Sequence, residues 1–239
     1  MRPLITLTTD FGLSDPYVAA MKGVILGISP DAHVIDISHG VRPQRVLHAT
    51  FITQSAWPYF PDGALSAALP DGARPRDGDN VAPVPLPGGY RAFTIANPRY
   101  LQQPVSATFH GRDVFAPAAA HLSMGLSPHE LGEPVDHVLA FPPLRARRRH
   151  DGSLEARVIH IDRFGNIVTD ARAADLPDGA VAVELAGESV PGLVRTYVGA
   201  SGLVALVGSS GYLEVAQPDE SAANSLAVEI GDPVLVRRR

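Results

Sequence analysis

The chain of 239 residues contains no cysteine. Disulfide bonds, thiolate metal sites and cysteine nucleophiles are therefore excluded. An excess of positive charge is also missing, because the formal net charge is -5 at pH 7. Since nucleic-acid-binding proteins usually present a basic face, we expect no nucleic-acid partner.

Long apolar runs are missing as well, and none approaches the length of a membrane-spanning helix. The first residues do not show the charged and then apolar pattern of a secretory signal. We therefore expect a soluble, cytoplasmic protein with no membrane partner. Apolar residues still make up 45% of the chain, which is enough for a substantial core.

The first half of the chain alternates strand and helix patterns. The apolar run that begins at Leu4 predicts a buried strand, and residues 14–16 predict a helix start with Asp15 as its cap. The buried face of that helix is predicted to contain Val18, Met21, Ile25 and Ile28. Further strands are predicted at 33–38, 65–69 and 91–96, and further helices at 44–57 and 112–124. Such alternation is typical of an α/β domain with a mostly parallel sheet and helices on both faces.

The pattern changes near residue 150. From Glu155 onward, short β-rich runs separated by turns replace the helix patterns. This spacing predicts a smaller all-β domain of the barrel or sandwich type. We place the boundary in the Pro- and Arg-rich segment 141–151, whose short run of arginines is more typical of a solvated linker than of a phosphate-binding patch. The predicted domains are 1–142 and 152–239.

The first predicted strand ends in the sequence T-T-D-F-G, which delivers a carboxylate to the end of a buried strand. Ligands of open α/β sheets bind at the carboxyl ends of the strands, so a functional role for Asp10 is favoured over a simple strand stop. Asp15 and Tyr17 follow across the turn, although helix capping explains Asp15 at least as well. The D-F-G tripeptide also occurs in protein kinases, but the sequence has no glycine-rich loop or H-R-D segment, which excludes a kinase.

A second cluster, T-F-H-G-R-D, precedes the alanine-rich helix predicted at 112–124. It brings an imidazole, a guanidinium and a carboxylate together at a helix entrance. The helix dipole explains Asp113, because it favours an acid in the first turn. For His110 and Arg112, a functional and a structural role are equally consistent with the pattern.

A third cluster, I-D-R-F-G-N, contains Asp162, Phe164 and Asn166. An aromatic ring beside an amide suits a planar heterocycle, because the ring stacks on it while the amide hydrogen-bonds to its edge. A β-turn at residues 163–166 explains the same residues, and the two interpretations are compatible.

A fourth cluster, G-S-S-G-Y-L-E-V, places Ser209 and Ser210 between two glycines. Hydroxyl groups in such a loop are able to hydrogen-bond a zwitterion or a phosphate. Taken alone, the cluster is better explained as a hairpin turn.

The candidate metal ligands in and near these clusters are Asp10, Asp15, His110 and His121. No recognised ligand spacing, such as H-E-x-x-H, connects them. We therefore expect no metal site.

Together, the four clusters resemble the S-adenosylmethionine hydroxide adenosyltransferase family, which is related to the fluorinases and chlorinases. The similarity runs through nearly the whole chain, in the order TTDFGLSDPYVAAMKGVI, SATFHGRDVFAPAAAHL, IDRFGNIVTD and GSSGYLEVA, followed by SAA. Four motifs in this order are a much more specific match than any one of them.

The resemblance implies an N-terminal α/β domain, a C-terminal β domain and a homotrimer whose ligand pockets lie between domains of neighbouring subunits. It implies that water or hydroxide attacks C5′ of the ribose of S-adenosylmethionine, which releases adenosine and L-methionine. S-adenosylmethionine is then the substrate, and no metal or redox cofactor takes part.

The resemblance also implies roles for individual residues. Asp10 matches the acid that accepts hydrogen bonds from both ribose hydroxyls, and Asn166 matches the amide that contacts adenine. The positions that match the methionine end of the ligand are Asp15, Tyr17, Asp162, Ser209 and Ser210, and the ring contacts are Phe164 and Tyr197. His110 matches one member of the hydrolases' Asp–Arg–His set. Gly111 stands where halogenating relatives carry a serine that holds the halide, which favours hydrolysis.

Residues 60–80 depart from the family pattern, in which a D-P-G-V-G segment is followed by paired arginines. Counting without gaps places Asp71 at the catalytic acid, and Arg76, with Arg74 as the alternative, replaces the missing arginine. Two hypotheses therefore remain open. Either the chain is a working hydrolase in which Asp71, one of these arginines and His110 form a shifted set, or it binds S-adenosylmethionine or adenosine with little or no turnover.

Overall fold

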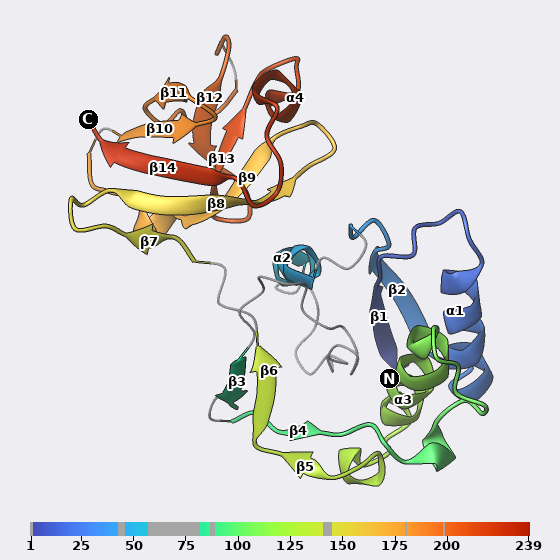
Figure 1. The fold of residues 1–239 in the computed structure, drawn as a ribbon. Helices are drawn as coiled ribbons and strands as arrows, with labels where there is room; N and C mark the ends of the chain where they lie inside the picture. Colours follow the sequence, from blue (N-terminus) through green and yellow to red (C-terminus); the bar gives the residue numbers. More distant parts are fainter. Residues whose placement is uncertain are drawn as a thin grey trace. The chain divides into compact units, whose positions relative to one another are not determined.

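The computed structural model describes residues 2–42, 46–56, 82–86, 89–140, 145–179, 181–197 and 199–239. By its internal contacts the chain divides into two units, Met1–Pro142 and Pro143–Arg239. The elements of each unit are labelled in Figure 1, and each unit is described by itself.

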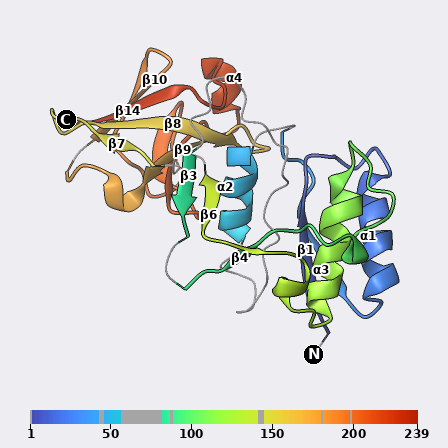
Figure 2. The same ribbon diagram turned by 60° about the horizontal axis from the view of Figure 1, so that its bottom comes forward.

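A pair of parallel strands lies at the centre of the first unit. β1 (Leu4–Thr8) pairs with β2 (His33–Ser38), and the helices α1 (Tyr17–Ile28) and α3 (Ala116–Ser123) pack against each other beside this pair. In both ribbon views, these helices lie on one side of the strand pair and α2 (Val46–Ala56) lies on the other (Figures 1 and 2). The strand pair is thus covered by helices on both faces.

The core of this unit follows the periods that the sequence predicted. Its buried cluster consists of Ile5, Leu7, Met21, Ile25, Ala116 and Ala120. The two cluster residues of β1 are two positions apart and therefore lie on the same face of the strand. The two cluster residues of each helix are four positions apart and therefore lie on the same face of that helix. One detail of the prediction is wrong, because Pro16 and not Asp15 is the N-cap residue of α1. Asp15 lies one residue too early to occupy the capping position.

Two short antiparallel pairs accompany the parallel pair. They are β3 (Ala82–Pro85) with β6 (His137–Ala140), and β4 (Ala92–Phe93) with β5 (Pro134–Val135). Among the described residues of this unit, β1 and β2 are therefore the one parallel pair. The described residues therefore show a parallel pair and two antiparallel pairs, and not the mostly parallel sheet expected from the sequence.

The other predicted elements of the first unit are shorter or more irregular than expected. α2 lies within the helix predicted at 44–57, and the strand predicted at 91–96 is reduced to β4. The helix predicted at 112–124 begins as a π-helical turn, η3 (Gly111–Phe115), before it continues as α3. The strand predicted at 65–69 lies outside the described residues. In the described ranges of the chain, no helix is both long and apolar enough to cross a bilayer.

The second unit is an antiparallel β-sheet with very few helical turns. Its strands run in the spatial order β11-β10-β14-β8-β9-β13-β12, and β7 pairs with β8 beside that path. The strands are β7 (Arg147–Arg148), β8 (Leu154–Ile161), β9 (Ile167–Arg172), β10 (Val181–Leu185), β11 (Glu188–Pro191), β12 (Val204–Val207), β13 (Tyr212–Ala216) and β14 (Pro233–Arg238). Because β11 and β12, at the two ends of this order, also contact each other, the sheet is nearly closed and barrel-like. This agrees with the all-β domain predicted from the sequence.

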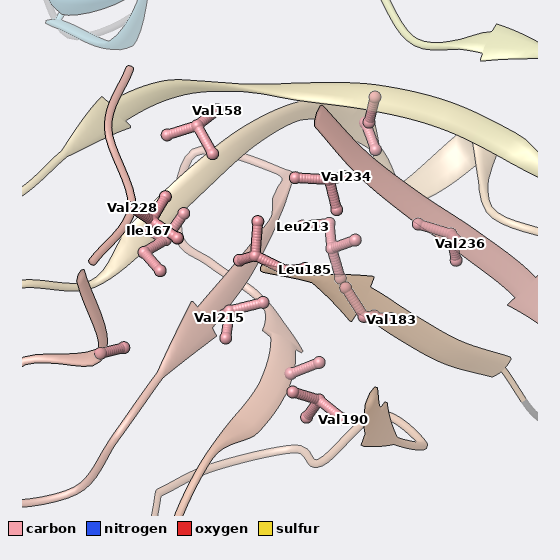
Figure 3. Close-up of a cluster of buried hydrophobic side chains, with 14 of the residues drawn as sticks. Val158, Ile167, Val183, Leu185, Val190, Leu213, Val215, Val228, Val234 and Val236 are labelled. Atoms are coloured by element: carbon pink, nitrogen blue, oxygen red, sulfur yellow. The ribbon is translucent and has the colours of Figure 1, made fainter. Parts of the chain in front are cut away.

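The interior of the barrel-like sheet is filled by branched aliphatic side chains. Val183 of β10, Leu213 of β13 and Val234 of β14 point toward one another, together with neighbours from the same strands (Figure 3). Along β10, buried and partly buried residues alternate, as expected for a strand with one face on a core. The short helix α4 (Ala222–Leu226) adds two buried alanines to this core.

Candidate functional site

The turn that carries Asp10 lies at the carboxyl end of β1, next to the carboxyl end of β2. The backbone N–H of Thr9 donates to the Ser38 carbonyl at 2.9 Å, and that of Gly12 donates to the His39 carbonyl at 2.8 Å. Gly12 has a φ of +65°, a conformation that glycine adopts without strain. Asp10 is partly buried between these two anchors. It therefore occupies the edge at which parallel sheets bind ligands.

Three aromatic rings join this turn to the second sequence cluster. Phe11 and Phe109 meet edge to face with ring centroids 5.5 Å apart, and Tyr17 lies 5.6 Å from Phe11 and 5.2 Å from Phe109. Tyr17 is 44% exposed, so one side of this aromatic trio faces solvent. The trio places Tyr17, at the start of α1, beside the loop that leads to His110. Asp15 is exposed two residues before Tyr17.

The acid of the H-G-R-D sequence has a structural role. Asp113 is fully buried and receives hydrogen bonds from Arg112 Nε at 2.6 Å and Nη2 at 3.0 Å. It also accepts from the Ser106 backbone N–H at 2.8 Å. The hydrogen bonds from Arg112 outweigh burial and lower the pKa of Asp113 to about 2. Arg112 also lies over the Phe109 ring, with its Cζ 4.9 Å from the centroid.

This ion pair shapes the loop on which the two candidate residues of the second cluster lie. The Phe109 backbone N–H donates to Ser106 Oγ at 2.9 Å, so the loop is held at both ends. His110 follows as the partly buried N-cap residue of η3. Of the two, Arg112 is thus bound to Asp113 in an ion pair.

Gly111 lies against the aromatic trio. A Cβ atom at this position would lie 3.1 Å from Met21 Sδ and 3.3 Å from Phe11 Cε2, closer than side chains normally pack. A side chain next to His110 would therefore require Met21 and Phe11 to shift by a few tenths of an ångström.

In the second unit, Asp162 organises the loop of the third sequence cluster. Its carboxylate accepts from the backbone N–H groups of Phe164 at 2.8 Å and Asn166 at 2.9 Å, and from Asn166 Nδ2 at 2.9 Å. These bonds orient the Asn166 amide and leave the Phe164 ring 76% exposed. The predicted turn and an exposed ring beside an oriented amide are thus both present.

The same loop packs on the start of α4. Gly165 has a φ of +86°, and any Cβ there would collide with Ser221. The Ala223 backbone N–H donates to the Gly165 carbonyl at 3.0 Å, while Ser221 caps α4 by accepting from Asn224 N–H at 3.1 Å. The I-D-R-F-G-N and S-A-A sequences therefore form one structural element.

Two acids and a tyrosine gather near this loop. Burial, followed by the charge of Asp162, raises the pKa of Glu214. Burial, followed by the charges of Glu214 and Asp162, raises the pKa of Tyr197. The carboxylate of Glu214 also lies directly against Gly208, where no Cβ would fit. The G-S-S-G hairpin, closed by a Gly208 N–H bond to the Tyr212 carbonyl at 2.9 Å, therefore starts beside this group.

Glu214 was not predicted from the sequence. Its one indication in the sequence is a charged residue inside the otherwise uncharged run Y-L-E-V-A. In the structure it is partly buried in β13, whose other four residues are all buried. Ser209 is exposed and Ser210 is partly buried at the tip of the hairpin. The structure thus brings Asp162, Tyr197 and Glu214 together and places Ser210 close by in the chain.

The predicted catalytic Asp71 and Arg76, with the alternative Arg74, lie outside the described residues. In the part of the chain that the structure describes, no group of three or more His, Asp or Glu residues is arranged to hold a metal ion.

Comparison with protein families matches both units. The model of the SAM hydroxide adenosyltransferase N-terminal domain matches residues 5–74 and 79–132. The model of the SAM hydroxide adenosyltransferase C-terminal domain matches residues 156–235. The two matches follow each other in the order in which the four clusters occur.

Curated relatives match over nearly their whole length. The chain is 39% identical to an (R)-S-adenosyl-L-methionine hydrolase of Thermus thermophilus, over 98% of this chain and 99% of that protein. It is 33% identical to an (R)-S-adenosyl-L-methionine hydrolase of Salinispora tropica, over 98% and 97% of the two chains. A fluorinase of Nocardia brasiliensis is 24% identical over 99% and 97%.

Solved structures have the same fold. A conserved protein of Thermotoga maritima superposes with a TM-score of 0.78 at 27% identity, over 98% of this chain and all of that one. The match therefore includes both units and the elements that carry the four clusters.

Proposed function

The chain belongs to the S-adenosylmethionine hydroxide adenosyltransferase family, and from that premise we propose that it hydrolyses S-adenosylmethionine to adenosine and L-methionine. The observation that carries this proposal is the match of both units to relatives named as hydrolases, at 39% identity over nearly the full length. Such relatives support turnover over the alternative of a protein that only binds the ligand.

The reaction is a displacement at a carbon that already carries a good leaving group. The oxygen of water forms a bond to C5′, the bond from C5′ to sulfur breaks with its electron pair going to sulfur, and methionine leaves as a neutral thioether. The proton of the attacking water passes to a base. The protein therefore needs chiefly to align the two reacting atoms and to accept a proton.

The first unit carries the ribose and water part of the proposed site. Asp10 accepts hydrogen bonds from both ribose hydroxyls, which fits its position at the end of β1. His110, with Asp71 and Arg76, positions and activates the water. The fixed loop between Ser106 and Asp113 supports this assignment for His110.

Asp15 and Tyr17 are proposed to contact the methionine end of the substrate. Tyr17 is the first residue of α1 and Asp15 precedes the helix, and both are exposed beside the turn that carries Asp10. Asp162, Ser209 and Ser210 of the second unit are proposed to contact the same end.

The second unit also carries the proposed adenine contacts. Asn166 hydrogen-bonds the edge of the base, and the rings of Phe164 and Tyr197 contact its face. The exposed Phe164 ring and the oriented Asn166 amide support this assignment.

Gly111 supports hydrolysis over halogenation. A serine at this position would crowd Met21 and Phe11, as the 3.1 and 3.3 Å approaches of a Cβ indicate. The chain therefore lacks the hydroxyl, and the Met21 and Phe11 side chains would have to shift to admit one.

We further propose domains at 1–142 and 152–239, with a mostly parallel sheet in the first. The second domain is proposed to complete the site of a neighbouring subunit in a cytoplasmic homotrimer. S-adenosylmethionine is the substrate, and the chemistry requires no metal or redox cofactor, because the sulfonium group already activates C5′.

The proposal is tested by incubating the purified protein with S-adenosylmethionine in ¹⁸O-labelled water. We expect adenosine and L-methionine in equal amounts, above the spontaneous background, with the label in the 5′-hydroxyl of adenosine. Binding of the substrate without release of adenosine would refute hydrolysis. Adenosine that lacks the label would show that water does not attack C5′.

Asp71→Ala tests the proposed catalytic acid. We expect it to abolish turnover and to leave the affinity for adenosine unchanged. Unchanged turnover would show that the acid is misassigned.

A further inference from the structure

A buried histidine without a role in the proposed chemistry lies next to the turn that carries Asp10. His39 follows the last residue of β2 and is 6% exposed. Its Nδ1 lies 2.8 Å from the Thr9 hydroxyl, and its Nε2 lies 3.1 Å from Asp36 Oδ1. The imidazole thus lies between a carboxylate of β2, at ion-pair distance and without hydrogen-bond alignment, and the residue that precedes Asp10.

The polar groups continue on both sides of the histidine. Asp36 Oδ2 accepts a hydrogen bond from Lys22 Nζ of α1 at 2.6 Å. Burial raises the pKa of Asp36, but the contacts with Lys22 and His39 outweigh it and lower the pKa overall. The carboxylate that faces His39 is therefore an anion at neutral pH.

The charge of this carboxylate determines which imidazole nitrogen carries the proton. An anion opposite Nε2 favours the tautomer with its proton there, which leaves Nδ1 as an acceptor. The Thr9 hydroxyl then donates to Nδ1, and its oxygen remains free to accept from the Phe11 backbone N–H, at 3.4 Å. The Thr9 hydroxyl thus donates one hydrogen bond and accepts another, and the two together hold the side chain in one orientation.

The backbone on the same side holds the rest of the turn. The His39 carbonyl accepts from Gly12 N–H at 2.8 Å, and the Ser38 carbonyl accepts from Thr9 N–H at 2.9 Å. His39 therefore contacts the turn at both ends, by its side chain at Thr9 and by its backbone at Gly12. Asp10 lies between these two contacts.

We propose that His39 is a positioning residue that acts through the Thr9 hydroxyl to aim the Asp10 carboxylate at the vicinal hydroxyls of the ribose. This inference rests on the proposed function, in which Asp10 binds the ribose. A carboxylate accepts two hydrogen bonds from a diol only in a narrow range of orientations, so a small rotation of the turn loses one of them. The side chain of Asp36 keeps the imidazole in the tautomer that the Thr9 hydroxyl requires.

The test compares the affinities of adenosine and 2′-deoxyadenosine, measured by calorimetry. Two hydrogen bonds to the diol make the wild-type protein prefer adenosine. Thr9→Val removes the hydroxyl at constant volume, and we expect it to reduce this preference by about tenfold, near the lower end of the effect of one hydrogen bond to a charged group. Thr9→Ser keeps a hydroxyl, and we expect it to retain the preference.

Thr8→Val, at the last residue of β1, is the matched control one position before Thr9. The Thr8 hydroxyl lies 3.5 Å from Thr53 Oγ1 of α2, on the other side of the strand, and we expect its loss to leave the preference unchanged. A role of Thr9 in packing alone would weaken both nucleosides equally and leave their ratio as in the wild type. That outcome would overturn the inference.

Two substitutions of His39 test its role through the Thr9 hydroxyl without changing Thr9. Their result does not depend on whether the Thr9 variants fold correctly. His39→Asn keeps an acceptor near the position of Nδ1, and His39→Gln keeps a donor near the position of Nε2. We expect the asparagine variant to prefer adenosine more strongly than the glutamine variant does. Equal ratios for the two variants would contradict a role through the Thr9 hydroxyl.

Asp10→Ala separates this inference from the proposed function. If the wild type shows no preference, or Asp10→Ala leaves the preference intact, the ribose role of Asp10 fails and the inference fails with it. If Asp10→Ala removes the preference and Thr9→Val does not, the inference alone is wrong.

Discussion

Phe11 and Phe109, which come from separate sequence clusters, meet edge to face with ring centroids 5.5 Å apart. The first follows Asp10 and the second precedes His110. Their contact therefore brings the proposed ribose acid and the proposed catalytic histidine to the same part of the first unit.

Replacing the buried acid Asp113 with asparagine removes the ion pair with Arg112. We expect Asp113→Asn to lower the melting temperature at pH 7 by on the order of 5 °C. The hydrogen bonds from Arg112 lower the pKa of Asp113 from its ordinary 3.8 to about 2. A lowered pKa stabilises the fold above the ordinary value, and this stabilisation is lost as the pH falls toward the lowered one.

The difference in melting temperature between this variant and the wild type is therefore expected to be largest above about pH 4 and to shrink in acid. Asp31→Asn, at an exposed acid of the same unit, is the control and is expected to change little. A constant difference across this pH range would show that the charge of Asp113 is not the cause.

Replacing Gly111 with serine tests whether a side chain at this position is too crowded by Met21 and Phe11 for normal activity. A Cβ there would lie 3.1 Å from Met21 Sδ, so we expect Gly111→Ser to reduce adenosine formation by about tenfold through misplacement of His110. Gly111→Ala is expected to reduce it equally, because the crowding comes from the Cβ. A halogenated nucleoside formed by the serine variant in chloride or fluoride would contradict this prediction.

Replacing Gly165 with alanine combines backbone strain with a collision against Ser221. We expect a loss of about 3 kcal/mol in the free energy of unfolding, measured in urea, together with weaker adenosine binding through displacement of Asn166. Gly187 provides the matched control, since its φ of +83° is similar but no atom lies within 4 Å of its Cβ position. Gly187→Ala is expected to lose only about 1 kcal/mol, from strain alone. Equal losses would show that the contact with Ser221 does not matter.

Replacing Glu214 with glutamine removes a charge that the fold disfavours. Burial, followed by Asp162, raises the pKa of Glu214 above its ordinary 4.5. The folded state therefore binds the Glu214 proton more tightly than the unfolded state does. Protonated Glu214 stabilises the fold fully below the ordinary pKa, and this stabilisation is lost as the pH rises through the raised pKa. We expect Glu214→Gln to raise the melting temperature at pH 7 by about 3 °C and to have no effect near pH 4.

Glu229→Gln, at an exposed acid of the same unit, is the control for this measurement. A gain in melting temperature for Glu214→Gln that persists unchanged in acid would exclude the charge as its source.

The elements with a strong period were predictable from the sequence. β1 and α1 lie where the apolar spacing placed them, because burial of one face imposes a period of two or of about 3.6 residues. β2 covers the predicted residues 33–38. The strands of the second unit followed from short apolar runs between turns. The capping position of α1 and the length of β4 were not predictable, since they depend on local geometry and on β5, a distant strand.

The amino-acid sequence by itself determined which chemical groups are present in the four clusters, and at which strand and helix ends they lie. Local periodicity and local hydrogen bonds decide both, as the bonds from Phe164 and Asn166 to Asp162 illustrate. The tertiary structure alone decided which of these groups meet. Thr9 and His39, which are 30 residues apart in the chain, meet through a hydrogen bond between their side chains. Glu214 lies near enough to Asp162 for the charge of Asp162 to raise its pKa. Contacts of this kind leave no period in the sequence, because they arise only when strand pairing brings distant segments side by side.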